Sequence, residues 1–208
     1  MIKLMTVLFS LVIALFFSKN LLNYLVKKYP EYSMDDKYKK MIYVLSLVFI
    51  VLAQHKININ LQLIDLSWVC HILISCLIGV LSATLSVSFI IDCLFQELPD
   101  ENNFIIGLCI FPIGLYLYGL KVFICAIVLF ITFFIFAFIT GQLGMGDVKM
   151  VFFMGLGFSL DMLMQFVFVS FFTASIYGIV KLIKTKCSKN QMFAFGPFLI
   201  VGFLSVIL

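Results

Sequence analysis

Two aspartates lie at the edges of apolar segments in this chain of 208 residues. Asp92 follows the apolar run Ser67–Ile91, and Asp147 precedes another apolar run. An ionisable side chain in or beside a membrane segment is a candidate for a functional site. Two carboxylates that come close together share one proton, so that one can accept a proton from water while the other donates a hydrogen bond to a carbonyl. Such a pair can hydrolyse an amide bond without a metal ion, which makes Asp92 and Asp147 the first candidates.

Two glycines flank Met145 directly before the second of these aspartates, in the segment Gly144-Met145-Gly146-Asp147. Glycine permits backbone conformations that other residues avoid, and it lets a second backbone pass close by. We therefore expect this segment to bring the Asp147 carboxylate against an extended peptide.

The composition restricts what kind of protein can position these residues. The chain is 64% hydrophobic and 12% charged, with a mean hydropathy of +1.21, whereas soluble domains are about half apolar and about a quarter charged. Soluble, disordered, fibrous and coiled-coil proteins are therefore excluded, and an integral membrane protein remains. The net charge of +4 comes from lysines without any arginine, and we interpret it as a signal of membrane orientation, with no nucleic-acid partner.

Eight apolar segments predict an all-α, polytopic bundle of about eight transmembrane helices. They are Ile2–Asn23, Met41–Ala53, Ser67–Ile91, Asn103–Gly119, Val122–Thr140, Val148–Leu160, Met162–Leu182 and Met192–Leu208. We expect Gly196-Pro197 to break or kink the last segment.

The lysines predict the orientation of these spans. With eight alternating spans, the loops Tyr24–Lys40 and Ile183–Gln191 lie on the same side, and most of the 14 lysines collect there. The positive-inside rule makes that side cytoplasmic and places both termini on the opposite side. Asp92 and Asp147 then share the cytoplasmic membrane boundary.

At this point the chain resembles the type IV prepilin leader peptidases, a family of membrane-embedded GxGD aspartyl peptidases. The stretch Asp92–Asp100 is similar to the family's D-x₅-[IL]-P-[DN] element, with Leu98, Pro99 and Asp100 as its end. The stretch Gly144–Lys149 is similar to its GxGDxK element, and Phe195–Phe198 resembles its C-terminal P-F-G-P-F segment with Ala194 in place of the first proline. The three elements occur in the family's order and extend over about half of the chain.

This resemblance implies an aspartic endopeptidase in the cytoplasmic membrane of a prokaryote. It implies Asp92 and Asp147 as the catalytic pair, and the basic leaders of type IV prepilins or pseudopilins as substrate, removed at the cytoplasmic face. The other motif residues that support this resemblance are Gly144, Gly146, Lys149, Leu98, Pro99 and Asp100.

The chain departs from the longer members of that family in its first loop. Those members carry a large insertion with two C-x-x-C pairs and also N-methylate the trimmed pilin, whereas residues 24–40 contain no cysteine. We therefore expect no metal, no cofactor and no methyltransferase activity. The expected organisation is a first helix with a shortened loop, residues 1–41, followed by a peptidase domain, residues 42–208.

Acidic residues surround the first motif, since Glu97, Asp100 and Glu101 follow Asp92 without any base between them. They are expected to attract a basic leader, with Glu97 and Glu101 as leader-binding residues. In the alternative, Asp100 caps the following helix and the glutamates are only solvated. Lys149 is expected either to steady the Asp147 carboxylate or to anchor at the lipid headgroups.

Helix dipoles predict which aspartate holds the proton. Asp147 opens a helix, where the positive end favours an anion, and Asp92 lies near the end of one, where the negative end favours the neutral acid. The prediction is therefore an ionised Asp147 and a protonated Asp92. Pro99 also predicts that the first of these helices stops within two turns of Asp92.

Two other classes remain open from the sequence. One is another GxGD intramembrane protease of the presenilin or signal-peptide-peptidase type, which pairs GxGD with a Tyr-Asp in the preceding span; here Ile91 precedes Asp92. The other is a non-enzymatic membrane protein, a transporter or an assembly scaffold, for which polar groups near mid-membrane and internal repeats are expected.

Overall fold

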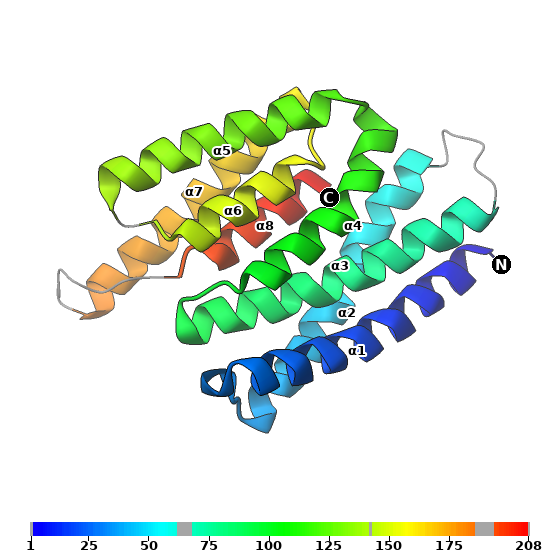
Figure 1. The fold of residues 1–208 in the computed structure, drawn as a ribbon, viewed down its shortest axis with the longest axis horizontal. Coiled ribbons are helices and arrows are strands. Elements are labelled where there is room, and N and C mark those ends of the chain that lie inside the picture. Colours follow the sequence, from blue (N-terminus) through cyan, green and yellow to red (C-terminus); the bar gives the residue numbers. More distant parts are fainter. Residues whose placement is uncertain (1, 62–67, 142, 186–193, 208) are drawn as a thin grey trace.

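The described part of the protein is a bundle of α-helices without strands (Figure 1). This computed structural model describes residues 2–61, 68–141, 143–185 and 194–207. Eight α-helices and one 3₁₀ turn lie in these ranges: α1 (Ile2–Lys28), η1 (Pro30–Tyr32), α2 (Asp36–Leu61), α3 (Trp68–Phe95), α4 (Asp100–Tyr118), α5 (Lys121–Thr140), α6 (Met145–Gly155), α7 (Leu160–Thr185) and α8 (Gly196–Ile207). The predicted all-α class is confirmed.

Five of the described helices are long and apolar enough to cross a membrane: α1, α3, α4, α5 and α7. The protein is therefore a multi-pass membrane protein. By contrast, α6 has 11 residues and α8 has 12, which gives each a length of about 17 Å, against a hydrocarbon core about 30 Å thick.

The sixth helix differs from its prediction at both ends. The expected span was Val148–Leu160, but α6 begins at Met145 and ends at Gly155. A Cβ at Gly114 of α4 would collide with the carbonyl oxygen of Leu156, so the turn after α6 packs directly onto the α4 backbone. Hydropathy does not report this contact, because the residues beyond Gly155 remain apolar.

The last helix also differs from its prediction. Gly196-Pro197 forms the first turn of α8, instead of kinking a longer helix. Proline is tolerated there because the first amides of a helix have no partner within the helix. The predicted start of that span at Met192 lies outside the described residues, as do Ser67 and the loop lysines Lys186 and Lys189.

Helix α3 is the centre of the molecule, since it packs against α1, α2, α4 and α8. It contributes to two apolar clusters. One contains Leu81 and Leu85 together with residues of α4 to α8, and the other contains Val87, Ile90 and Ile91 together with residues of α1, η1 and α2. Because α3 is fixed from both sides, its last turn is a rigid platform for Asp92.

The end of α3 lies at the same end of the bundle as the starts of α4, α6 and α8, on the left in Figure 1. Helix α3 stops at Phe95, within one turn of Asp92, as Pro99 predicts. The turn is made by Gln96, which has a φ of 57° although it is not glycine. This arrangement gathers the three sequence motifs at one end of the molecule.

Candidate active site

A pocket of about 480 Å³ opens where these helix ends meet. Asp92 and Asp147, which are 55 positions apart in the sequence, both line it. Its remaining walls come from the turn after α1, the connection between α3 and α4 with the first residues of α4, and the start of α6 with the residue before it. The residues are Tyr29, Tyr32, Gln96, Glu97, Leu98, Pro99, Asp100, Glu101, Gly144 and Gly146. The pocket contains every residue predicted for the site except Lys149.

Asp92 lies in the last turn of α3 with 3% of its surface exposed. Its Oδ2 accepts a hydrogen bond from the backbone N–H of Gly196, the first residue of α8, over 2.8 Å. This donor is at a helix N-terminus, where free amides and the helix dipole both stabilise a negative charge. The carboxylate of Asp92 is therefore held as an acceptor by a second helix.

Asp147 lies in the first turn of α6 with 8% of its surface exposed. Its Oδ1 is buried and has no hydrogen-bond partner. Burial and the negative charge of Asp92 raise the pKa of Asp147 to about 7, because both disfavour a second anion in the pocket.

The three motifs meet at the side chain of Leu98. A Cβ at Gly146 would lie 3.1 Å from Leu98 Cβ, and a Cβ at Gly196 would lie 3.2 Å from Leu98 Cδ1. Any larger residue at either glycine would press on Leu98. Gly144 has no such steric role, because a Cβ there would approach only Asp147 Oδ2, at 3.4 Å.

Residues 79–179 match the type IV leader peptidase family. The predicted resemblance is thereby confirmed over that region, which includes Asp92, Leu98 and Asp147. Residues 79–179, here called the leader peptidase region, support a peptidase that acts on a protein substrate. Comparisons with curated proteins and with solved structures gave no significant match.

Within the leader peptidase region, the contacts favour the opposite charge assignment to the one predicted from helix dipoles. The prediction took account only of the helix that carries each aspartate. Asp92 receives a donor from the N-terminus of α8. Asp147 has one oxygen, Oδ1, without a donor, although a hydrogen bond with the Gly144 backbone favours its anion. An ionised Asp92 and a protonated Asp147 fit these surroundings better. The sequence does not reveal the approach of α8, which depends on tertiary packing.

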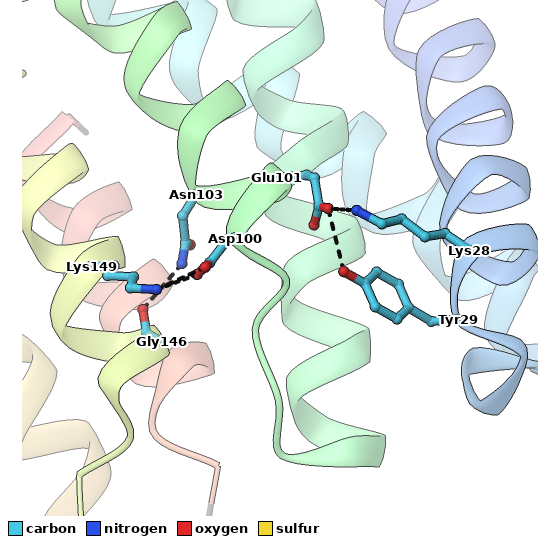
Figure 2. A network of polar contacts seen from close by, with 7 residues as sticks. All are labelled: Lys28, Tyr29, Asp100, Glu101, Asn103, Gly146 and Lys149. Carbon is cyan, nitrogen blue, oxygen red and sulfur yellow. Dashed lines mark hydrogen bonds and ion pairs between the residues drawn. The ribbon is translucent and has the colours of Figure 1, made fainter.

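A buried asparagine positions the GxGD segment of the leader peptidase region. Asn103 of α4 is completely buried, and its Nδ2 donates to the carbonyl oxygen of Gly146 over 3.1 Å (Figure 2). This carbonyl belongs to the peptide that leads into Asp147. Asn103 was not among the predicted site residues, although a polar amide at the start of the predicted span Asn103–Gly119 was a detectable signal.

Lys149 pairs with Asp100 and not with the Asp147 carboxylate that it was expected to steady. Its Nζ pairs with Asp100, at 2.8 Å from both carboxylate oxygens (Figure 2). The expectation that Asp100 caps α4 is also wrong, because the N-cap position is Pro99 and no side chain caps it. The pair instead joins the start of α4 to the start of α6.

The two glutamates predicted to bind a leader contact the segment from the end of α1 to the end of η1. The Tyr32 hydroxyl donates to Glu97 over 3.1 Å, and Lys28 and the Tyr29 hydroxyl both donate to Glu101 (Figure 2). These three residues lie outside residues 79–179. In the sequence this segment is recognisable only as a basic loop, and no sequence signal connects it to the pocket.

Proposed function

We propose that the protein is an aspartic endopeptidase that removes the basic leader of type IV prepilins or pseudopilins. The observation that carries this proposal is the shared pocket of Asp92 and Asp147, inside a region that matches leader peptidases. The pair lies beside a row of acidic side chains in the same pocket, which suits a basic leader.

In the proposed reaction, the carboxylate of Asp92 accepts a proton from water while the oxygen of that water attacks the scissile carbonyl carbon. Asp147 donates its proton to the carbonyl oxygen. The tetrahedral intermediate collapses when protonated Asp92 transfers a proton to the leaving nitrogen and the C–N bond breaks. As the carbon–oxygen double bond of the product re-forms, the new carboxyl group of the product returns a proton to Asp147. Asp92 and Asp147 thereby regain their starting protonation states.

We further propose the membrane arrangement predicted from the lysines. All eight helices would cross or enter the bilayer of a prokaryotic inner membrane, with both termini outside and the pocket at the cytoplasmic face. In this proposal, residues 1–41 form a first helix with a shortened loop, and residues 42–208 form the peptidase domain.

The test is co-expression with a candidate prepilin in a host without its own leader peptidase. The wild type is expected to shorten the prepilin, whereas Asp92→Asn and Asp147→Asn are expected to lower the processing rate by at least about a thousandfold. Asp161→Asn is the matched control, because Asp161 is an exposed acid at the start of α7.

The mass of the processed N-terminus completes the test, since we expect trimming without methylation. Processing that persists in both aspartate variants would contradict the proposal and favour a non-enzymatic membrane protein.

A further inference from the structure

We infer that Lys28 occupies the place at Glu101 that a basic side chain of the substrate takes, and that Lys28 thereby sets the affinity of the enzyme for basic leaders. This inference rests on the proposed function, which it extends from the carboxylate pair to the opposite wall of the pocket.

Lys28 is the last residue of α1, and it reaches across to the first turn of α4. Its Nζ donates to Glu101 Oε1 and lies 5.2 Å from the centre of the Tyr29 ring. The Tyr29 hydroxyl donates to the same carboxylate oxygen over 3.3 Å. A lysine of the protein is thus bound by a carboxylate and an aromatic face, the two groups that recognise a cationic side chain.

This lysine can be displaced. The Lys28 side chain is 43% exposed and Glu101 is 28% exposed, and ion pairs with this much exposure hold their partners only weakly. Lys28 is at the end of its helix, so its long side chain can turn out to water without any change in the backbone. An incoming ammonium or guanidinium group would then meet the same acceptor.

The pocket holds further capacity for such a group. Glu101 Oε2 is buried and has no hydrogen-bond partner, so the carboxylate has an acceptor that neither Lys28 nor Tyr29 uses. Asp147, more than nine-tenths buried, lines the same pocket and also has an oxygen without a hydrogen-bond partner. A peptide that places a basic side chain at Glu101 can therefore extend along one continuous pocket to the two aspartates.

Competition of this kind predicts a distinct kinetic effect. Removing Lys28 leaves Glu101 available to the substrate, so KM for a basic leader should fall while kcat changes little. A leader without the basic residues gains nothing from a vacant Glu101, so its KM should stay the same. If Lys28 only braced α1 against α4, its loss would affect both leaders equally.

The experiment compares a lysine-containing leader peptide with the same peptide carrying Gln at each lysine. For Lys28→Gln we expect KM for the basic peptide to fall about twofold to fivefold, the range that an exposed ion pair allows. Lys27→Gln is the matched control, because this neighbouring lysine is exposed and loses the same charge. The inference is overturned if KM for the basic peptide stays the same or rises. It is also overturned if KM changes equally for the two peptides.

Glu101→Gln provides the reciprocal variant. It should raise KM for the basic peptide alone, and Lys28→Gln should then have no further effect in the Glu101→Gln background. Independent effects of the two changes would contradict a shared position.

Binding to Asp147→Asn, measured by fluorescence anisotropy of both labelled peptides, separates this inference from the proposed function. Failure of the wild type to cleave, with tighter binding of the basic peptide in Asp147→Asn/Lys28→Gln, would reject only the peptidase proposal. If the wild type cleaves the leader but Lys28→Gln does not change KM differently for the two peptides, only the inference is rejected.

Discussion

The carboxylate of Asp92 is anchored by a main-chain donor and not by another side chain. The Gly196 N–H binds its Oδ2 over 2.8 Å, and a Cβ on Gly196 would lie only 2.7 Å from that same oxygen. Glycine is therefore required here for space. The position of one carboxylate depends on the absence of a methyl group 104 residues further along the chain.

Gly196→Ala should consequently impair the reaction more than the fold. The new methyl group must push the Asp92 carboxylate away, and a displacement of about 1 Å in a reacting group costs on the order of a hundredfold in rate. The expected result is a large fall in kcat for leader cleavage with only a modest fall in thermal unfolding temperature. Gly178→Ala is the control, since a Cβ there meets nothing within 4 Å. Equal activity of both variants would contradict this account.

The protonation of Asp147 predicts how activity depends on pH. Burial and the charge of Asp92 raise its pKa to about 7, so Asp147 holds its proton below that pH and loses it above. Because the proposed acid must be protonated, kcat should fall as pH rises through about 7. A kcat that continues to rise beyond pH 8 in detergent-solubilised enzyme, with folding verified at each pH, would reject Asp147 as the acid.

At the scale of the helices, α4 aligns α6 through two contacts that differ in character. The ion pair of Lys149 with Asp100 is exposed and contributes at most about 1 kcal/mol. The hydrogen bond from Asn103 to the Gly146 carbonyl involves a fully buried side chain, and it ties α4 directly to the backbone that leads into Asp147. Asn103 is therefore the stronger positioning residue for the GxGD segment.

Two adjacent asparagines allow this role to be tested against a matched control. Asn102 and Asn103 are both fully buried, but Asn102 Nδ2 donates to Ser88 Oγ of α3 over 3.0 Å instead of to α6. Asn102→Leu and Asn103→Leu should each lower the free energy of unfolding by about 1–3 kcal/mol. Only Asn103→Leu should lower kcat by about tenfold or more and shift the pH profile. If Asn102→Leu shifted the pH profile by the same amount, the role of Asn103 would be structural only.

The helices also show where sequence reasoning succeeds and where it stops. Long apolar runs identified α3, α5 and α7 well, because transfer from water to lipid dominates their energetics. The same signal misplaced the end of α6, where contact between Gly114 and Leu156 turns the chain early. It also could not show that α8 begins against Asp92, because that contact joins residues far apart in sequence.

Across the whole molecule, the pocket is built from three stretches of chain that the sequence does not connect. Asp92 and Asp147 were predictable because acids beside apolar segments are rare and because their motifs are specific. The contribution of Lys28, Tyr29 and Tyr32 was not predictable. In the sequence they belong to an ordinary basic loop, and only the packing of α1 along α3 brings them to the pocket. The roles of Glu97 and Glu101 stay predictions, to which the structure adds these partners.

The proposed membrane orientation can be tested by fusions at the two ends of the bundle. Alkaline phosphatase placed after Gly119, between α4 and α5, should be active because it lies outside. The same enzyme placed after Ser33, between η1 and α2, should be inactive because the lysines hold that end in the cytoplasm. The opposite pattern would place the pocket on the outer face.

The wall formed by Tyr29 and Tyr32 lies outside residues 79–179. An inhibitor that binds only the two carboxylates would contact only residues of the region that matches the leader peptidase family, so it would gain no selectivity from the rest of the chain. A compound that also carries a cation to Glu101 and contacts Tyr29 would draw part of its affinity from a surface that the matched region does not supply. This offers a route to an inhibitor that is selective for this protein.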